Sequence, residues 1–325
     1  MKVVILTKYG APDVLQVNEI STPKPDDHQV LIKIYATTVT AVDTTFRKGN
    51  EFFARLATGI IKPRIRILGT EFSGVIESVG KKVTLFKQGD PVFGDSGTHY
   101  GTYAEFICMS EKDIILRKPE NLSYEEATAI PYGALTALPF LRDSGNIQKG
   151  QQVLIIGAAG NVGIFAVQLA RYYGADVTGV CSHTKSELVM SLGAKRVIDY
   201  TKEDFLKRAE PYDIIFDTIG KYSFPQCKHL LNPKGIYLTT VLGFPILLHM
   251  MQTSLFSGKK AKLSLTGMRS TEDRFRDLNF ITDLIKQKQL KPIIDKTYPF
   301  EEISEAHKYV DLGHKTGSLI ITIKK

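Results

Sequence analysis

The sequence predicts an α/β protein in which a β-rich domain is interrupted by a doubly wound, parallel-sheet domain of the Rossmann type. Three observations lead to this prediction. Residues 1 to about 120 carry strand patterns broken by glycine and proline, without a regular alternation of strand and helix. From Gln151 onward, strand patterns alternate with helix patterns on the scale of a parallel sheet. A glycine-rich turn, Gly157–Gly163, joins the first of these strands to the first of these helices.

The first domain is expected to consist mainly of strands. The opening MKVVILTKYG has an apolar stretch too short for a signal sequence and predicts a first strand. Val30–Tyr35 and Phe72–Val79 run apolar or alternate, as strands do. The pattern changes at Ser123 and Glu126, whose spacing predicts a capping box and the start of a helix. A second helical stretch is predicted at Leu135–Leu141.

The second domain is expected to alternate strands with helices. Strands are predicted at Val153–Ile156, Asp176–Cys181, Val197–Ile198, Asp213–Phe216, Gly235–Val241 and Lys262–Thr266. Helices are predicted at 162–173, Ser186–Leu192, Glu203–Ala209 and Pro225–Leu231. The C-terminal part is expected to return to the first domain with a helix at Glu272–Gln287, a strand at Thr297–Phe300, a helix at Ile303–Leu312 and a strand at Ser318–Ile323. We therefore expect a β-rich domain of residues 1–122 and 268–325, and a Rossmann domain of residues 123–267.

Composition and charge argue against several classes of protein. Of 325 residues, 43% are hydrophobic and 23% are charged, and no apolar run approaches the roughly 18–20 residues of a membrane span. Cys108, Cys181 and Cys227 are widely spaced, which predicts no disulfide framework and a reducing, cytoplasmic location. The net charge of +8 favours anionic ligands, but the basic residues are dispersed, so we expect no nucleic-acid partner.

The turn Gly157–Gly163 suits a pyrophosphate. A turn between a buried strand and a helix aims free backbone N–H groups and the positive end of the helix dipole at one point. Gly160 would let a ligand approach the backbone, and Gly163 would let the helix pack closely on the strand. Ala158 occupies the first glycine position of the usual fingerprint. The pattern A-x-G-x-x-G predicts a dinucleotide site, against the alternative of a structural turn.

The end of the second Rossmann strand favours NADPH over NADH. An NAD site usually has an acid there, about 20 residues after the glycine turn, which binds the adenosine ribose. Here the strand ends in Cys181-Ser182-His183-Thr184-Lys185, and the first acid is Glu187. The hydroxyl of Ser182 and the amine of Lys185 would bind a 2′-phosphate, which an acid would repel. The alternative is that Lys185 is an exposed lysine at a helix start.

Several separate motifs, in order along the chain, resemble one known family. They are ILGTEFSGVI at 67–76, GDPVFG at 89–94, GTYAE at 101–105, LTA at 135–137, Gly157–Gly163, Gly193-Ala194 before Val197–Tyr200, and Ile303–Gly317. From end to end the chain resembles the zinc-free branch of the medium-chain dehydrogenase/reductase superfamily, the quinone oxidoreductase-like (zeta-crystallin-like) enzymes. The resemblance implies a GroES-like catalytic domain and a Rossmann NADP-binding domain.

The resemblance also implies positions for the cofactor. Lys185 and Tyr200 match family positions that contact the 2′-phosphate, and Thr136 matches a position near the nicotinamide. With the glycine turn included, the expected contacts to NADPH are Thr136, Ala158, Ala159, Gly160, Asn161, Val162, Gly163, Ser182, Lys185 and Tyr200.

The residues at the zinc positions of the superfamily predict a site without metal. Zinc relatives supply a ligand from a Gly-His-Glu motif, which here reads Gly69-Thr70-Glu71, and the usual first-ligand cysteine is absent from Thr37–Ala41. Hydroxyl oxygens at these places cannot hold zinc tightly. His99 and His183 have no partner at ligand spacing. We therefore expect no metal site.

Without a Lewis acid, the chemistry favours an acceptor that is already activated. A quinone or an α,β-unsaturated carbonyl can take a hydride because its charge is delocalised, and the protein then mainly positions it in a dry cleft. Thr40 and Tyr132 are the candidates for hydrogen-bonding the carbonyl, with an ordinary packing or turn role as the alternative for each. Asp43 is expected to be structural. Two tyrosines of relatives are matched here by Thr45 and Glu51.

Two other functions stay open at this point. An enoyl-thioester reductase of the same superfamily would need a longer acyl channel. An NADPH-binding protein with little turnover, as in the crystallin and RNA-binding relatives, would keep the cofactor site without the acceptor residues.

The segment Pro245–Lys262 has apolar residues at helical spacing and three lysines at its end. It can be a helix packed over its own cleft or a helix on a membrane surface. It can also wall the acceptor pocket and cover a dimer contact beside Lys262–Thr266, which we expect to be the sheet's edge strand. Because relatives commonly dimerise edge to edge there, we expect a homodimer.

Overall fold

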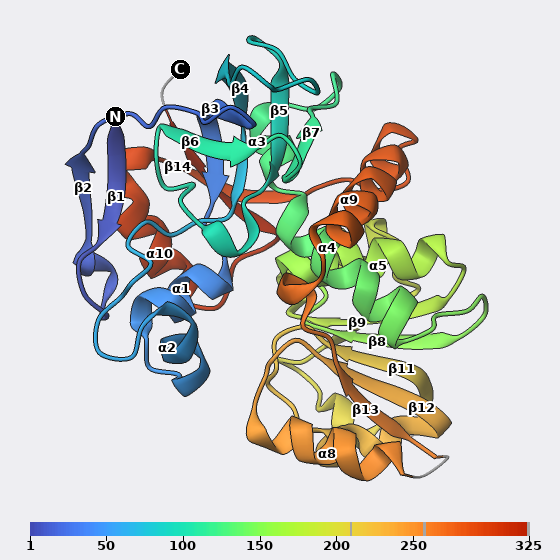
Figure 1. The fold of residues 1–325 in the computed structure, drawn as a ribbon. Coiled ribbons are helices and arrows are strands. Elements are labelled where there is room, and N and C mark those ends of the chain that lie inside the picture. The colour runs from blue at the N-terminus through green and yellow to red at the C-terminus, as the bar shows by residue number, and fades with distance from the viewer. Residues whose placement is uncertain (209, 256–257, 324–325) are drawn as a thin grey trace. The chain divides into compact units, whose positions relative to one another are not determined.

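The computed structural model describes residues 1–208, 210–255 and 258–323, and the chain divides into two compact units (Figure 1). The first unit comprises Met1–Tyr132, Ser270–Thr282 and Pro292–Lys325, and the second comprises Gly133–Arg269 and Asp283–Lys291. The boundaries expected after residues 122 and 267 differ from this division, because 123–132 groups with the first unit and 283–291 with the second. Within the described ranges, no helix has the length and apolarity needed to cross a membrane.

The first unit is built on mainly antiparallel sheets. Its larger sheet has the order β14-β15-β3-β4-β5-β7, with β6 paired to β3, and a separate hairpin joins β1 to β2. The strands are β1 (Lys2–Leu6), β2 (Leu15–Glu19), β3 (Gln29–Thr38), β4 (Glu71–Val79), β5 (Pro91–Asp95), β6 (Phe106–Ser110), β7 (Ile114–Arg117), β14 (Ile294–Pro299) and β15 (Ser318–Thr322). Because β15 pairs with β3, the C-terminal strands complete the N-terminal sheet, which confirms the predicted interruption.

The first unit contains two helices that the sequence analysis missed, α1 (Ala41–Lys48) and α2 (Phe52–Thr58). A capping box between Thr40 and Asp43 begins α1, and Gly49, at φ 57°, ends it. The other helices of this unit are α3 (Tyr124–Thr128), most of α9 (Thr271–Lys286), and α10 (Ile303–Asp311).

Helix α3 explains why residues 123–132 belong to the first unit. Its N-terminus has the capping box predicted for Ser123. The Ser73 hydroxyl on β4 donates to the Tyr124 carbonyl at 2.7 Å, and the Thr128 hydroxyl donates to the Ala36 carbonyl on β3 at 3.2 Å. These hydrogen bonds fasten α3 to the first sheet.

The second unit is a six-stranded parallel sheet with helices, as predicted. Its strand order is β10-β9-β8-β11-β12-β13, and every pair is parallel. The strands are β8 (Gln152–Ile156), β9 (Asp176–Cys181), β10 (Arg196–Asp199), β11 (Tyr212–Asp217), β12 (Leu231–Thr239) and β13 (Lys260–Leu263). The helices are α4 (Pro131–Pro139, starting in the first unit), α5 (Asn161–Tyr172), α6 (Ser186–Ser191), α7 (Phe224–Cys227) and α8 (Phe244–Ser254). The strand order reverses beside β8, and ligands bind at the carboxyl end of such a position.

Several boundaries in this unit differ from the prediction. The helix expected at Glu203–Ala209 is only a 3₁₀ turn at Phe205–Lys207, because the Asp204 side chain caps a tight turn at the Leu206 N–H, at 3.1 Å. Ala209 lies outside the described residues.

The strand expected at Gly235–Val241 begins earlier, at Leu231, which pairs with Tyr212, and it ends at Thr239. The helix expected at Pro225–Leu231 is formed by α7, Phe224–Cys227, and a 3₁₀ turn, Lys228–Leu230. Strand β13 starts and ends before the predicted Lys262–Thr266, but it is the last strand in the order, so the prediction of an edge strand is confirmed.

Candidate cofactor and acceptor sites

The glycine-rich turn connects β8 to α5 in the second unit. Gly157 has a φ of +77°, and its carbonyl accepts a hydrogen bond from the Gly160 N–H at 2.9 Å. A Cβ added at Gly163 would lie 2.1 Å from the Gly157 carbonyl oxygen. The turn therefore needs glycine at position 157 for its backbone conformation and at position 163 for close packing.

The alanine at the first fingerprint position has a structural explanation. The left-handed conformation falls one residue earlier, on Gly157, so a side chain is tolerated at Ala158. Ala158 is fully buried, and a Cβ added at Gly179 would come within 3.0 Å of the Ala158 methyl group. Ala158 and the buried Ala159 thus form the packed base of the turn.

The first turn of α5 presents hydrogen-bond donors that the helix does not use. Gly160 is the N-cap, and no side chain caps this helix. The N–H groups of residues 161–163 precede the first intrahelical bond, from Ile164 N to the Gly160 carbonyl at 2.8 Å. A Cβ added at Gly160 would meet only the Gly157 carbonyl, at 3.3 Å, so space is open in front of the turn. Open space, free donors and the positive end of the helix dipole fit the pyrophosphate of a dinucleotide.

Asn161 and Thr136 lie where α4 packs against the start of α5. A Cβ added at Gly133 would come within 2.2 Å of the Asn161 Oδ1, which shows how closely the helices approach. That oxygen is buried and has no hydrogen-bond partner among the described residues, so a donor on a bound ligand would satisfy it. Thr136 is one helical turn after Gly133, and it alone of residues 133–141 is not fully buried. Thr136 therefore reaches the surface beside the first turn of α5.

Ser182, Lys185 and Tyr200 come together at the carboxyl ends of β9 and β10. The Lys185 N–H donates to the Ser182 carbonyl at 3.0 Å, and the Tyr200 N–H donates to the Cys181 carbonyl at 3.2 Å. The Lys221 amine lies 6.0 Å from the centre of the exposed Tyr200 ring. The residues predicted to hold the 2′-phosphate therefore share one surface.

Asp199 lies on the same surface, and the sequence analysis missed it. Its Oδ2 is 4.0 Å from the His183 Nδ1, and its Oδ1 accepts bonds from the Thr201 hydroxyl at 2.7 Å and N–H at 3.0 Å. The Thr201 hydroxyl bond is the main cause that lowers the pKa of Asp199, so this group is a carboxylate at neutral pH. The sequence did contain a signal for Asp199, because it is an acid at the end of the third Rossmann strand. Strand β10 pairs with β9, and Asp199 lies opposite Cys181. This charge opposes a 2′-phosphate, whereas Lys185 attracts one.

A buried carboxyl group organises the other candidate site, in the first unit. Glu71 has no exposed surface. Its Oε1 accepts a bond from the Tyr132 N–H at 2.7 Å, and its Oε2 is bonded by the Thr38 hydroxyl. Burial raises the pKa of Glu71 to about 8, although these two bonds oppose the increase. Glu71 is therefore mostly protonated at neutral pH and joins the start of α4 to strands β3 and β4.

Thr40 has a structural role in the same unit. Its hydroxyl donates to the Asp43 Oδ2 at 2.7 Å and accepts from the Asp43 N–H at 3.3 Å. Asp43 is buried and accepts a further bond from the Gly69 N–H at 3.0 Å. The hydroxyl proton of Thr40 is thus donated within the cap of α1. This is the turn role that was given above as the alternative to contact with an acceptor.

Tyr132 is the stronger candidate for contact with an acceptor. It is half-buried, and its hydroxyl makes no hydrogen bond to any other described residue. Burial, and next the neighbouring Glu71 and Asp43, raise the pKa of Tyr132 well above its usual value, so the hydroxyl stays protonated and can donate. Thr40 and Tyr132 belong to the first unit, whereas every expected cofactor residue belongs to the second.

The donor atoms at the zinc positions do not fit zinc. The Thr37 hydroxyl donates to the Glu71 carbonyl at 2.8 Å and lies 2.8 Å from the Thr102 hydroxyl. The Thr38 hydroxyl is bonded to the Glu71 carboxyl group. In the described part of the chain, no three histidine, cysteine, aspartate or glutamate residues are grouped as a metal site requires. Zinc prefers thiolate, imidazole and carboxylate ligands. At these positions the carboxyl group of Glu71 is of that kind, and it already accepts bonds from Thr38 and Tyr132.

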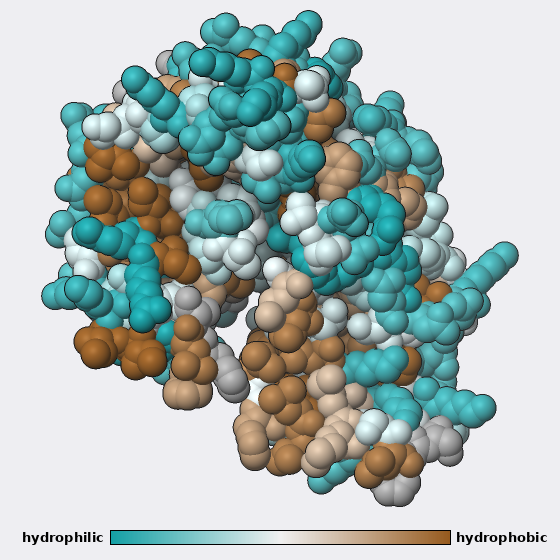
Figure 2. Space-filling view, in the orientation of Figure 1, coloured by the Kyte–Doolittle hydropathy of each residue, from teal (hydrophilic) through white to brown (hydrophobic). Residues whose placement is uncertain are grey.

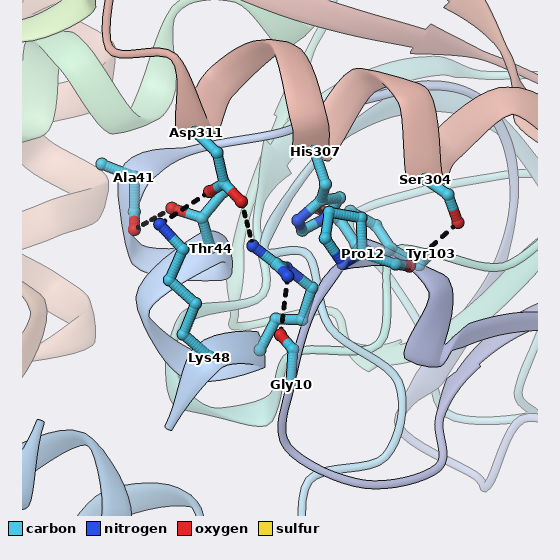
Figure 3. Close-up of polar contacts among 10 residues, drawn as sticks. Gly10, Pro12, Ala41, Thr44, Lys48, Tyr103, Ser304, His307 and Asp311 are labelled. Carbon is cyan, nitrogen blue, oxygen red and sulfur yellow. Dashed lines mark hydrogen bonds and ion pairs between the residues drawn. The ribbon is translucent and has the colours of Figure 1, made fainter. Parts of the chain in front are cut away.

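A separate polar network fastens α1, which carries Asp43, to α10 (Figure 3). Arg47 is fully buried; its Nη1 donates to the Gly10 carbonyl at 2.7 Å, and its Nη2 lies 2.5 Å from the Asp311 Oδ2. On α10, the His307 Nε2 lies 3.2 Å from the Tyr103 hydroxyl. Burial, followed by the charges of Arg47 and Lys48, lowers the pKa of His307 to about 3, so its ring is neutral. This network holds α1 in place.

Comparison with known proteins gives matches along the whole chain. A family model described as "Alcohol dehydrogenase GroES-like domain" matches residues 26–120, and one described as "Zinc-binding dehydrogenase" matches residues 192–321. The quinone oxidoreductase of Homo sapiens is 30% identical over 334 residues, covering 99% of this chain and 98% of that protein. The NAD(P)H oxidoreductase RTN4IP1, mitochondrial, of Homo sapiens is 29% identical over 354 residues, covering 98% and 88%. The solved structure of the quinone oxidoreductase from Coxiella burnetii has a TM-score of 0.88 at 28% identity, covering 100% of this chain and 99% of that one.

Proposed function

The chain belongs to the quinone oxidoreductase-like branch of the medium-chain dehydrogenase/reductase superfamily, and we propose that it is a zinc-independent, NADPH-dependent reductase of quinones or α,β-unsaturated carbonyl compounds. It is an oxidoreductase that uses a nicotinamide cofactor and acts on a small molecule. We infer the choice of NADPH, the class of acceptor and the independence of zinc from the residues of the two candidate sites.

The observation that carries this proposal is the uncapped first turn of α5 next to the strand end that carries Ser182 and Lys185. A pyrophosphate on the N–H groups of residues 161–163 directs the adenosine ribose toward the end of β9. Lys185 supplies a positive charge there, and Ser182 supplies a hydroxyl. NADPH is favoured because Lys185 can make a charged hydrogen bond to its 2′-phosphate, whereas the Asp199 carboxylate, which would repel that phosphate, is held by its bond from the Thr201 hydroxyl.

Bound NADPH would supply a hydride from its nicotinamide ring. The Tyr132 hydroxyl would donate a hydrogen bond to the acceptor carbonyl oxygen and so favour the negative charge that develops there. The reduced acceptor gains that hydride and one proton, which water or the Tyr132 hydroxyl supplies. No metal is required, because a quinone or enone delocalises the charge over its conjugated system.

Steady-state oxidation of NADPH against a panel of acceptors tests this proposal. Quinones and enones should be reduced, acceptors bulkier than simple benzoquinone should be preferred, and unactivated aldehydes should react poorly. Binding of NADPH and NADH is measured in parallel by titration. Turnover confined to enoyl thioesters would contradict the acceptor class, and tight NADPH binding without turnover of any acceptor would contradict a reductase role.

We also propose that two copies of the chain pair along the edge of the second unit's sheet. Strand β13 ends the strand order, so within the described residues one of its sides has no neighbouring strand. Helix α8 contacts β13 and exposes apolar side chains, among them Phe244 and Met251. A second copy would cover both the strand edge and this apolar face.

Light scattering tests the dimer and should give about twice the chain mass of 36.2 kDa. Met251→Glu should weaken the dimer or the binding of bulky acceptors, because a carboxylate would be buried in an apolar contact. Met190→Glu on α6, which is also exposed but precedes the opposite edge strand β10, is the matched control and should leave the mass unchanged. A monomer at micromolar concentration, with kinetics indifferent to Met251→Glu, would contradict this pairing.

A further inference from the structure

An exposed apolar surface lies on α2 and the loop that follows it, in the first unit. We call it the α2 tip and define it by Phe52, Leu56, Ile60 and Ile61, whose exposed fractions are 72%, 53%, 66% and 90%. Figure 2 shows apolar atoms gathered over this helix and loop. Side chains of this size are usually buried, and a cluster of them on the surface of a folded unit indicates an interaction site.

The backbone of the α2 tip is fixed, so its exposure is a property of the fold. The Arg64 N–H donates to the Thr58 carbonyl at 2.6 Å and closes the loop. The Tyr9 hydroxyl donates to the Gly59 carbonyl at 2.5 Å. Gly59 has a φ of +126°, and a Cβ there would lie 2.2 Å from the Lys62 carbonyl oxygen, so only glycine suits this turn.

Arg55 further holds the α2 tip. Its guanidinium lies 4.8 Å from the centre of the Tyr9 ring, and its Nη1 donates to the Ile60 carbonyl at 2.9 Å. The side chains of Ile60 and Ile61 are therefore presented to solvent by a loop whose main chain is already ordered.

The sequence around the α2 tip is rich in basic residues. Residues 47–66 contain six basic residues and one acid, Glu51. Arg47 and Lys48 pair with Asp311, and Arg55 is bonded to backbone carbonyls.

The remaining basic residues of this segment, Lys62, Arg64 and Arg66, are exposed and have no acidic partner among the described residues. They alternate with Pro63, which is buried, and with Ile65 and Ile67, which pack against the core of the first unit. Alternation in an extended segment places the three basic side chains together on the outer side.

We propose that the α2 tip binds the surface of an anionic membrane. Ile60 and Ile61 would enter the boundary between lipid headgroups and acyl chains, and Lys62, Arg64 and Arg66 would contact the anionic headgroups. An apolar tip beside unpaired basic residues complements a lipid surface in both respects. An RNA partner would use the charge alone, and a second copy of this chain, which carries the same positive charge at the same place, would be repelled.

The apolar face of α8 in the second unit is not accompanied by basic residues of this kind. The amines of Lys259, Lys260 and Lys262 donate to the carbonyls of Lys228, Thr253 and Ser144, at 2.8, 2.5 and 2.7 Å. Because these three amines are hydrogen-bonded to backbone carbonyls, α8 combines exposed apolar side chains with lysines that are already engaged, and we do not expect it to bind a membrane.

Docking at the α2 tip would bring the enzyme to acceptors dissolved in lipid, a consequence that rests on the proposed function. Membrane binding itself does not depend on turnover. It can therefore be tested, and can fail, independently of the reductase assignment.

The test is co-sedimentation of the full chain with vesicles of phosphatidylcholine, with and without phosphatidylserine, at low and high salt. The chain should bind the phosphatidylserine vesicles, and high salt should weaken binding. The triple variant Lys62→Gln, Arg64→Gln, Arg66→Gln should bind about a hundredfold more weakly, from about fivefold for each charge. The double variant Ile60→Ser, Ile61→Ser should bind at least about tenfold more weakly.

Met190→Ser on α6, an exposed apolar side chain outside both proposed contact surfaces, is the matched control and should bind vesicles as the unmutated chain does. Thermal unfolding of every variant checks that the fold is retained, which is expected because all the substituted side chains are exposed. The proposal is overturned if no vesicles are bound, or if pure phosphatidylcholine vesicles are bound equally well. It is overturned in favour of an RNA partner if the double isoleucine variant binds as tightly as the unmutated chain while the basic variant does not. A mass that falls by half in the isoleucine variant would assign the surface to a second copy.

Discussion

The buried carboxyl group of Glu71 should make the stability of the folded chain depend on pH in a measurable way. Burial raises its pKa from 4.5 to about 8, against the opposing effect of its bonds from Thr38 and Tyr132. We predict that Glu71→Gln removes this dependence. Glutamine has the shape of a protonated glutamate; its oxygen can accept from the Tyr132 N–H, and its amide can donate to the Thr38 hydroxyl.

The sign follows from the two protonation states of Glu71. Between pH 4.5 and about 8, the folded chain keeps a proton that the unfolded chain releases, so the free energy of unfolding falls as pH rises. At about 1.4 kcal/mol for each pH step, the fall amounts to about 5 kcal/mol at most. Below pH 4.5 Glu71 is protonated in both states, and the variant should be less stable by about 1 kcal/mol, because its hydrogen bonds are less well matched. Because the loss in the unmutated chain exceeds about 1 kcal/mol within about one pH step above 4.5, the variant should become the more stable protein at a pH of about 5 to 6 and stay so at higher pH.

Urea unfolding at a series of pH values measures this effect. Circular dichroism is the suitable signal, because the chain has no tryptophan. Burial also raises the pKa of Asp43 and Asp217, and the difference between the two proteins cancels these contributions. Two stability curves that run parallel from acid to alkaline pH would refute the reasoning, as would a variant that is the less stable protein at every pH.

Glu111→Gln is a control with the opposite sign. The Glu111 carboxylate accepts bonds from the N–H groups of Thr84 at 2.7 Å and Leu85 at 2.9 Å, and the Thr84 bond is the first cause that lowers its pKa. A lowered pKa stabilises the folded state above the unfolded value of 4.5 and ceases to do so as pH falls through the folded value. This variant should therefore be destabilised at neutral pH and should recover relative to the unmutated chain in acid.

Four further predictions concern the cofactor, the acceptor and metal. NADPH should bind at least about tenfold more tightly than NADH, and Lys185→Ala should remove that preference without changing NADH affinity, as measured by titration; equal affinities in the unmutated chain would contradict the assignment. Asp199→Asn should strengthen NADPH binding and leave NADH binding nearly unchanged, and weaker NADPH binding would show that Asp199 supports the site. Tyr132→Phe should lower kcat by about tenfold to a hundredfold with little change in KM, and an unchanged kcat would remove this hydroxyl from the reaction. Exhaustive chelation should leave turnover intact, whereas stoichiometric zinc by metal analysis would contradict the proposed independence of zinc.

The glycine-rich turn could be predicted from the sequence because its signals are local. The apolar run of β8, the glycines and the helical spacing of α5 lie within about 25 residues, and each restricts the backbone directly. The capping box at Ser123 is a signal of the same kind. By contrast, α1 was not predicted, because its threonines and valine are weak helix formers and its cap pairs Thr40 with aspartate rather than the usual glutamate or glutamine.

The sequence by itself determined the α/β class, the order of strands and helices, and the place of the glycine turn, since these follow from the periodicity of neighbouring residues. Only the tertiary structure decided which side chains are free to act. Asp199 lies near His183 because β10 pairs with β9, and Glu71 is buried against a backbone N–H 61 residues away, at Tyr132. The hydroxyl of Thr40 is occupied by Asp43, whereas that of Tyr132 is not bonded to other described residues. The pKa of a group and its capacity to donate depend on burial and on partners, and both arise from packing between segments that are distant in the chain.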